Sequence, residues 1–150
     1  MRKLIPLLII TLSFLSCKEK VIELEKLQDR NGILYEINAS NPYSGRTVAY
    51  YENGQIRIDG KMEDGLLNGK YTIYRKNGKI WEQGEMKNGK HTGISKFYDE
   101  KGNISMEQEF KDDKMDGMYK SYYENGKIHI EATYSNDKIL HSKEYDINGN

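Results

Sequence analysis

The sequence repeats itself every 24 residues from Gly45 onward, and this period restricts the chain to a stacked, repetitive architecture. Four columns of identical residues stay in register across four successive units. The columns are Gly45, Gly69, Gly93 and Gly117; Tyr50, Tyr74, Tyr98 and Tyr122; Gly54, Gly78, Gly102 and Gly126; and Ile56, Ile80, Ile104 and Ile128. A unit this short cannot bury a core alone, so we expect each unit to pack against its neighbours.

Each unit contains two turn signals separated by stretches typical of β-strands. In the first unit the turns fall at Asn53-Gly54 and at Asp64-Gly65, and Asn-Gly between apolar positions is the strongest short signal of a hairpin. The later units place their turns at Asn77-Gly78, Asn88-Gly89, Lys101-Gly102, Asp112-Asp113, Asn125-Gly126 and Asn136-Asp137. We therefore predict an all-β fold, an extended and twisted antiparallel meander of repeated β-hairpins over residues 31–150.

The first turn is compatible with two strand registers. A two-residue loop at Asn53-Gly54 pairs Tyr50 with Arg57, whereas a three-residue loop places Tyr50 opposite Ile56. The register decides which side chains share a face of the sheet, and the sequence leaves both registers open.

Composition points to a thin sheet and gives no hint of nucleic acid as a partner. Apolar residues make up 37% of the chain and tyrosine contributes twelve positions, so burial must rely on amphipathic aromatic side chains. Lys plus Arg equal Asp plus Glu at 23 each, so no net field draws the chain to nucleic acid.

The first seventeen residues differ from all that follow. Arg2 and Lys3 are positive, residues 4–15 are apolar, and Cys17 is the single cysteine of the sequence. This order is typical of a secretory signal peptide, because a dozen apolar residues fall short of the roughly 20 that a transmembrane helix needs. A lone cysteine also leaves the mature chain without an internal disulfide.

Residues 14–17, Phe-Leu-Ser-Cys, resemble the lipobox of bacterial lipoproteins, in which the cysteine is acylated. The resemblance implies that residues 1–17 are a lipoprotein signal peptide ending in an acylated Cys17. We then expect an exported chain that is lipid-anchored to the bacterial cell envelope, at the periplasmic or surface face of the outer membrane. The alternative is a conventional signal peptide and a soluble secreted protein. Residues 18–30 are charged, and we interpret them as a tether, with an extra edge strand as the alternative.

Patterns that could carry chemistry are weak in this sequence. The stretch from Gly84 to His91 is close to a phosphate-binding loop, but it lies between two predicted strands instead of opening a helix. His91, His129 and His141 show no spacing typical of a metal site. We therefore expect no enzyme, no cofactor and no bound metal.

The candidate binding surface is the tyrosine column together with the single tryptophan. Its members are Tyr50, Tyr74, Trp81, Tyr98 and Tyr122. One interpretation is structural, with rings that cover and stabilise the sheet through cross-strand contacts. The other is functional, because tyrosine and tryptophan are preferred anchors of protein interfaces.

The columns of tyrosine, Asn-Gly and isoleucine, followed by Gly60-Lys61-Met62-Glu63-Asp64-Gly65, resemble the bacterial variant of the MORN repeat. The entry at Pro42-Tyr43-Ser44-Gly45 and the later units are similar to those of the YwqK-family antitoxins. The chain departs from the pattern where Asp113 and Asp137 replace the glycine of the second turn. It also departs at Gln108 and Ala132, which take the place of Gly60 and Gly84.

This resemblance implies a 24-residue MORN-like repeat, no cofactor, and binding instead of catalysis. We expect a non-enzymatic, protein-binding repeat module anchored in the cell envelope, with a role as an antitoxin or immunity protein that neutralises a partner toxin. The alternative is a structural envelope scaffold that contacts glycan or peptidoglycan. The expected partners are another protein, either a toxin or an envelope component, and the membrane through the lipid anchor.

Overall fold

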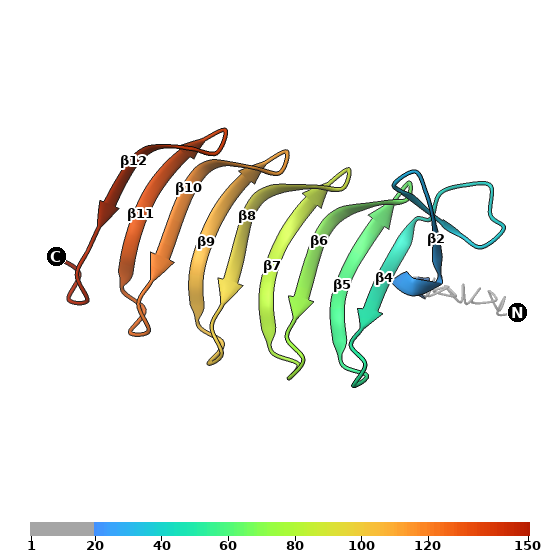
Figure 1. Cartoon of the computed structure of the whole chain (residues 1–150), viewed down its shortest axis with the longest axis horizontal. Helices are drawn as coiled ribbons and strands as arrows, with labels where there is room; N and C mark the ends of the chain where they lie inside the picture. Colours follow the sequence, from blue (N-terminus) through green and yellow to red (C-terminus); the bar gives the residue numbers. More distant parts are fainter. Residues whose placement is uncertain (1–19) are drawn as a thin grey trace, which may run out of the picture.

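A computed structural model describes residues 20–150, in which ten strands form one long sheet and two more form a separate hairpin (Figure 1). The order in the long sheet is β1-β4-β5-β6-β7-β8-β9-β10-β11-β12. Its strands are β1 (Val21–Glu23), β4 (Gly45–Tyr50), β5 (Ile56–Glu63), β6 (Leu66–Tyr74), β7 (Ile80–Lys87), β8 (Lys90–Tyr98), β9 (Ile104–Lys111), β10 (Lys114–Tyr122), β11 (Ile128–Ser135) and β12 (Lys138–Glu144). The predicted all-β meander of hairpins is therefore confirmed.

The N-terminal segment covers the first edge of the sheet. Strand β1 pairs with β4 in parallel, whereas the strand pairs from β4 to β12 are antiparallel. A 3-10 turn, η1 (Leu24–Lys26), connects β1 to β2 (Leu27–Arg30), which forms its own hairpin with β3 (Ile33–Glu36). Residues 18–30 were interpreted as a tether or as an extra edge strand. Val21–Glu23 forms an edge strand, and Leu27–Arg30 forms β2, which ends at the predicted start of the repeat domain.

The lower turns, along the bottom of Figure 1, follow the three-residue register. Tyr50 lies opposite Ile56, the Tyr51 N–H donates to the Gln55 carbonyl at 2.8 Å, and the Gly54 N–H donates to the Tyr51 carbonyl at 2.9 Å. Gly54 has a φ of 80°, which an L-residue reaches only at a steric cost. The glycine column is therefore required by the turn, which is a type I turn closed by a bulge residue of positive φ.

The upper turns are two-residue loops in which both residues have positive φ. Asp64 and Gly65 have φ values of 50° and 77°, and Glu63 pairs with Leu66 across them. The later turns use aspartate in the second position, and Asp113 reaches a φ of 69°. Its Oδ1 accepts the His91 N–H at 2.8 Å, a bond to the neighbouring hairpin that the glycine of earlier units cannot make. This bond offsets the loss of glycine.

The sheet is a single layer with a narrow buried row on one face. Side chains alternate between the two faces of a strand, so one face, here called the tyrosine face, carries the tyrosine column. The opposite face, here called the central face, carries the buried row. Its most buried members are Thr47, Ala49, Gly60, Met62, Tyr71, Glu82, Ser95, Gln108 and Ala132. Because four of them are polar, hydrogen bonding and fit within this row matter more than a thick apolar core.

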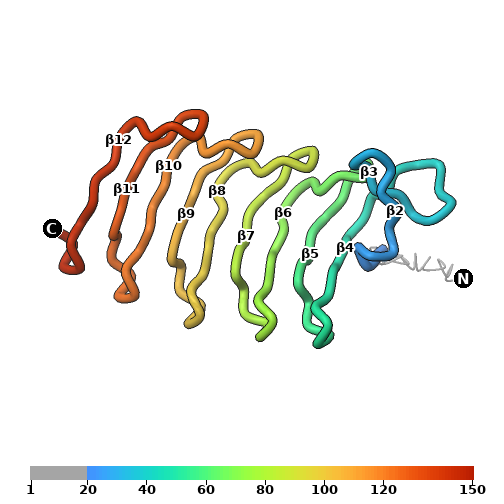
Figure 2. The backbone as a smooth tube through the Cα atoms, viewed as in Figure 1, coloured from blue at the N-terminus to red at the C-terminus, as the bar shows by residue number. Residues whose placement is uncertain are grey.

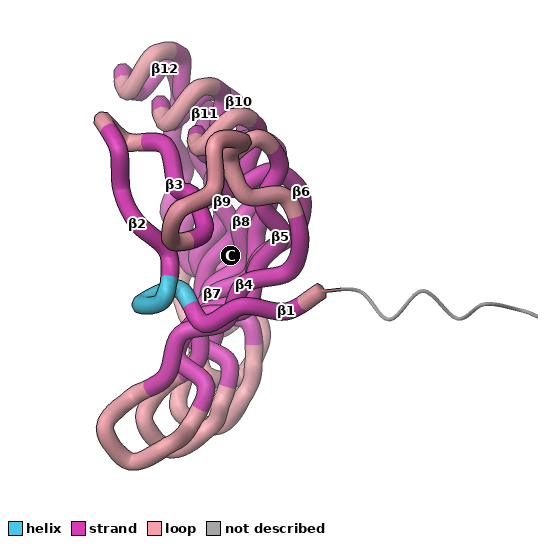
Figure 3. The backbone as a smooth tube through the Cα atoms, turned by 90° about the vertical axis from the view of Figure 1, so that its right-hand side faces the viewer, coloured by secondary structure: helices cyan, strands magenta, loops and turns pink. Residues whose placement is uncertain are grey.

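The array is elongated and bowed. Figure 2 shows the hairpins stacked in sequence order, with the two ends of the described chain at opposite ends of the array. Figure 3 looks along this stack, and both rows of turns curve toward the same side, where β2 and β3 also lie. The two faces of the sheet and the two rows of turns therefore extend along the whole length of the array.

Candidate binding surface

Two tyrosines of the column, Tyr98 and Tyr122, are tied to the hairpin that precedes them. Tyr98 Oη donates to Gln83 Oε1 at 2.8 Å, and Tyr122 Oη donates to Glu107 Oε2 at 2.7 Å. Burial and the Glu107 carboxylate raise the pKa of Tyr122 to about 12, because both favour the neutral phenol. Tyr98 and Tyr122 are therefore engaged within the sheet.

Tyr145 takes the place of the column residue in the last turn, although it comes one residue earlier than the period requires. Its Oη donates to Glu131 Oε2 at 2.8 Å. The acceptors of these bonds, Gln83, Glu107 and Glu131, belong to a second 24-residue column that begins at Asp59, which accepts from Arg46 instead. The sequence interpretation missed this column, although the regular spacing of acidic and amide residues could have revealed it.

Lysines cross to the same acidic column and form a charged ladder on the tyrosine face. Lys96 Nζ lies 3.0 Å from Glu107 Oε1, and Lys120 Nζ lies 3.0 Å from Glu131 Oε1. The Tyr122 hydroxyl and Lys96 hold the pKa of Glu107 below its usual range. The middle of this face is thus occupied by pairs internal to the sheet.

Tyr50 has a different environment from the rest of its column. Its residue surface is 43% exposed, and it lines a shallow hollow with Ile22, Ile37 and Val48, where β1 and the end of β3 meet β4. Tyr50 therefore lies at a hollow formed with the N-terminal segment, which Tyr74 does not line.

Trp81 occupies a bulge that removes it from the regular ladder. Ile73 pairs with Glu82 and Tyr74 with Ile80, so Trp81 has no partner on β6 and is 42% exposed. The equivalent bulged residues are Arg57, Ser105 and His129. This column changes chemistry in every unit, although it directly follows the invariant Ile column. A bulge changes the direction in which a side chain points. In this array the bulge carries a different side chain in each of the four units.

A cleft of about 400 Å³ lies beside the bulge. It is lined by Tyr51, Tyr74, Arg75, Lys76, Asn77, Trp81 and Glu100. The Phe97 ring supports Trp81 edge-on at a centroid distance of 6.2 Å, and Lys76 Nζ lies 6.0 Å from the centre of the Tyr51 ring. Of the predicted surface, Tyr74 and Trp81 are thus brought together, whereas Tyr50, Tyr98 and Tyr122 lie elsewhere.

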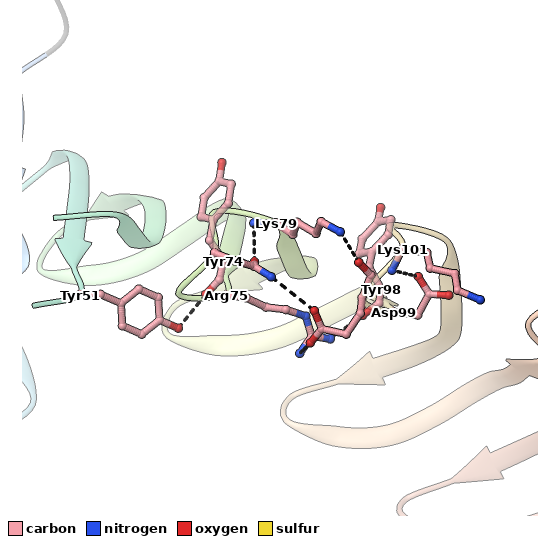
Figure 4. Close-up of polar contacts among 9 residues, drawn as sticks. Tyr51, Tyr74, Arg75, Lys79, Tyr98, Asp99 and Lys101 are labelled. Atoms are coloured by element: carbon pink, nitrogen blue, oxygen red, sulfur yellow. Dashed lines mark hydrogen bonds and ion pairs between the residues drawn. The ribbon is translucent and has the colours of Figure 1, made fainter. Parts of the chain in front are cut away.

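The walls of the cleft are held by bonds between successive lower turns. Tyr51 Oη donates to the Tyr74 carbonyl at 2.8 Å, and Arg75 Nη2 donates to the Tyr98 carbonyl at 2.7 Å. Figure 4 shows this edge, with the Tyr74 and Tyr98 rings pointing to one side and Tyr51 reaching along it. Arg75 Nη1 also lies 3.4 Å from Glu100 Oε1. These contacts set the position of an arginine and a tyrosine before any partner arrives.

The buried row contains a polar cluster that sequence reasoning missed. Tyr71 Oη donates to Glu82 Oε1 and lies 3.5 Å from Ser95 Oγ. Burial and the hydrogen bond to Glu82 raise the pKa of Tyr71. Gly84 leaves room for the Tyr71 ring, since a Cβ there would lie 2.9 Å from Tyr71 Cε1. The cluster is enclosed within the sheet, so we assign it to packing.

The same row explains why Gln108 departs from the repeat pattern. Gln108 stands where Gly60 and Gly84 stand in earlier units, and it lies opposite the small Ser95. In contrast, Gly84 lies opposite the large Tyr71. Large and small residues have exchanged sides, which keeps the row filled. This departure therefore preserves the packing of the unit.

Three further observations bear on the expected site. Within residues 20–150, no group of three or more His, Cys, Asp or Glu side chains is arranged to hold a metal ion. Among the same residues, no helix is both long and apolar enough to cross a membrane. Cys17 and the predicted signal peptide lie outside the described residues.

Comparison with known protein families gives one match. A family described as the MORN repeat variant matches residues 43–64, 67–88, 92–112 and 115–136, which together make up more than half of the chain. No curated protein matches the sequence. MORN repeats are typically modules that bind proteins or membranes, and they are not a known enzyme family.

Proposed function

Since this chain belongs to the MORN repeat variant family, we propose that it is a protein-binding module that recognises its partner at the cleft beside Trp81. The observation that carries the proposal is the bulge at Trp81. It exposes the single tryptophan of the sequence next to Tyr51 and Arg75, which neighbouring turns hold in place. Tryptophan, tyrosine and arginine are the residue types that dominate binding energy at protein interfaces.

The proposal includes the location and the role of the module. Acylation of Cys17 would hold the array at the cell envelope, and β1 begins four residues after this cysteine. The role that we propose is that of an antitoxin or immunity protein, which occupies a toxin at the membrane and blocks its action. Support comes from the repeat variant itself and from an exposed anchor set without a catalytic arrangement on the described surface.

The test is a cross-linking pull-down of the tagged, membrane-anchored chain from its own cells, read by mass spectrometry. Trp81→Ala should lose one dominant protein partner, because truncation of a central aromatic anchor costs about 2 kcal/mol or more, or roughly thirtyfold in affinity. The intrinsic fluorescence of Trp81 should also shift to shorter wavelength when the partner covers it.

The repeat supplies a matched control. His129 occupies the same bulged position two units later, so His129→Ala should retain the partner. Equal loss with both variants, or no loss with either, would refute the cleft as the recognition site. Retention on purified cell wall that depends on Trp81, with no enriched protein, would instead favour the envelope scaffold that contacts glycan. Labelling with a palmitate analogue that is lost in Cys17→Ser tests the anchor.

A further inference from the structure

The bulged residues form a row of equivalent positions along the array. Arg57, Trp81 and Ser105 hold the same place in three successive units, because the strand pairing skips one residue at each of them. Equivalent positions in successive hairpins are two strands apart, and neighbouring strands lie about 4.7–4.9 Å apart. The row therefore presents one side chain about every 9.4–9.8 Å along the array.

The cleft beside Trp81 also extends from unit to unit. Its lining includes Tyr51 from the first unit, Tyr74, Arg75 and Trp81 from the second, and Glu100 from the third. A bound segment that contacts all three units therefore crosses the strands instead of running beside one of them. Such a segment meets equivalent positions of the array at the hairpin spacing.

The polyproline II conformation has a period that matches this spacing. It has three residues per turn and presents the same face about every 9.3 Å. A β-strand advances about 9.9 Å in three residues but then presents its opposite face. An α-helix returns to nearly the same face after seven residues, or about 10.5 Å. Over two intervals of the array, the mismatch is about 0.6 Å for polyproline II and about 2 Å for the helix.

The side chains of the cleft suit a polyproline II segment. This conformation has no internal hydrogen bonds and proline has no N–H, so the segment offers carbonyl oxygens and compact apolar rings. The indole N–H of Trp81 has no hydrogen-bond acceptor among residues 20–150, where the ring contact with Phe97 is its described interaction. Tyr51 and Trp81 supply rings, and Trp81 and Lys76 supply donors. Aromatic-lined grooves of this kind recognise proline-rich segments.

Charge along the row adds a second requirement. Arg57, one unit before Trp81, has a side chain that is 39% exposed, and its Nη2 lies 3.6 Å from Oε1 of the exposed Glu25. An exposed ion pair contributes little, so Arg57 can engage a carboxylate of a bound segment. In the fourth unit His129 packs against the Tyr123 ring at a centroid distance of 4.4 Å. The segment therefore uses the first three units of the row.

We propose that the cleft beside Trp81 binds an acidic, proline-rich segment of the partner protein in the polyproline II conformation. A proline of this segment lies on Trp81, and a glutamate or aspartate three residues away lies opposite Arg57. The inference rests on the proposed protein-binding function and names the class of segment that the partner presents. Because the segment is extended before it binds, it loses little conformational entropy in the cleft.

The test titrates synthetic peptides into the full chain in detergent and follows the intrinsic fluorescence of Trp81. Trp81 is the single tryptophan of the chain, and the peptides contain no aromatic residue, so the signal reports this site. The probe has four prolines on each side of a central glutamate, which places a proline three residues from the carboxylate in either chain direction. In one comparison peptide lysine replaces the glutamate, and in the other glycine replaces every proline.

We expect the glutamate probe to shift the Trp81 emission to shorter wavelength and to bind about threefold to tenfold more tightly than the lysine peptide, since the charge opposite Arg57 changes sign. The glycine peptide should bind least, because it loses the most backbone freedom. Arg57→Glu should reverse the preference between glutamate and lysine. Lys70→Glu makes a comparable charge change opposite Glu85 on the tyrosine face and should leave the preference as it was. Equal binding of the proline and glycine peptides, or the same effect from both chain variants, would overturn the proposal.

Ser105→Arg tests the three-residue period directly. The variant places a second cation two units from Arg57, where it faces the sixth residue beyond the first carboxylate of a polyproline II segment. A proline peptide with glutamates six residues apart should gain about twofold to fivefold in affinity from the variant, and one with glutamates five residues apart should gain less. Equal gains would rule out the polyproline II geometry. If no peptide changes the Trp81 signal and the natural partner still depends on Trp81, the proline-rich segment is rejected and the proposed function is retained.

Discussion

Gly84→Ala should destabilise the protein although the change normally favours a strand. Gly84 lies in extended backbone, so alanine would ordinarily gain about 0.4–1 kcal/mol by restricting the unfolded chain. Here the new Cβ would lie 2.6 Å from Ser95 Oγ and 2.8 Å from Tyr71 Oη. Ser95 is fully buried and Tyr71 is 4% exposed, so neither can move away freely.

The expected cost follows from these contacts. Overpacking typically costs about 1–3 kcal/mol, and displacement of the Tyr71 hydroxyl weakens a hydrogen bond to the Glu82 carboxylate, a class worth about 1.5–3 kcal/mol. Once the stabilisation from restricting the unfolded chain is subtracted, we expect the free energy of unfolding to fall by about 1–3 kcal/mol. Urea denaturation measures it, with the m-value checked because repeat arrays can lose cooperativity.

Gly60→Ala is the matched control for this prediction. Gly60 holds the same repeat position one unit earlier, but its added Cβ would meet Leu67 Cδ2 at 3.0 Å and Tyr71 Cβ at 3.6 Å. The end of a leucine side chain can shift, so we expect a smaller loss. The cost of Gly84→Ala should also fall in a Tyr71→Ala background, where the ring is absent. A Gly84→Ala protein as stable as the parent, or an equal cost in both backgrounds, would refute the reasoning.

Two further predictions concern protonation. The His91 N–H lowers the pKa of Asp113, so Asp113 adds stability that is fully present above its unfolded pKa of about 3.9 and is lost as pH falls through the lower folded value. Asp113→Asn should flatten urea stability across this acid range, and an unchanged acid profile would contradict the bond. The pKa of Tyr122 is raised to about 12, so its contribution is present below the unfolded value of about 10 and is lost as pH rises through 12. Tyr122→Phe should remove one phenol that ionises near pH 12 in an ultraviolet titration, and an intact high-pH step would show that this assignment is wrong.

Local turn chemistry explains why the sequence predicts the fold well. Asn53-Gly54 and Asp64-Gly65 predict the two turns of the unit. Gly54 and Gly65 have positive φ values, which explains why glycine recurs at these turn positions. The register was open because both loop lengths satisfy the apolar pattern. The three-residue loop is favoured by contacts inside the turn, where the Gln55 N–H donates to Asn53 Oδ1 at 3.1 Å and Gly54 takes a positive φ, and Asn-Gly alone does not distinguish this turn from a two-residue loop.

The candidate site was only partly predictable because it depends on contacts between units. Trp81 and Tyr74 were predicted from residue type, and the cleft that joins them requires the turn of the next unit to supply Glu100. The parallel pairing of β1 carries no turn signal. The pair Tyr71 and Gly84 is replaced by the pair Ser95 and Gln108 in the next unit, and the two members of each pair lie on neighbouring strands. A single sequence column shows only that glycine is replaced by Gln108, without the compensating change from Tyr71 to Ser95.

The lower edge has consequences for how the array responds to mechanical load. Tyr51, Arg75 and Tyr123 each donate to a carbonyl of the following hairpin, whereas Asp99 in the same column accepts hydrogen bonds from Lys101 and Asn103 of its own turn. A carboxylate cannot donate to a carbonyl, so this tie cannot form at the third joint. Tension between the two ends of the array acts across the strands and loads the joints in series. An exposed ion pair between Lys101 Nζ and Glu124 Oε2, at 2.7 Å, crosses this joint instead. Because exposed ion pairs contribute little, we expect the hairpins to separate first beside Asp99.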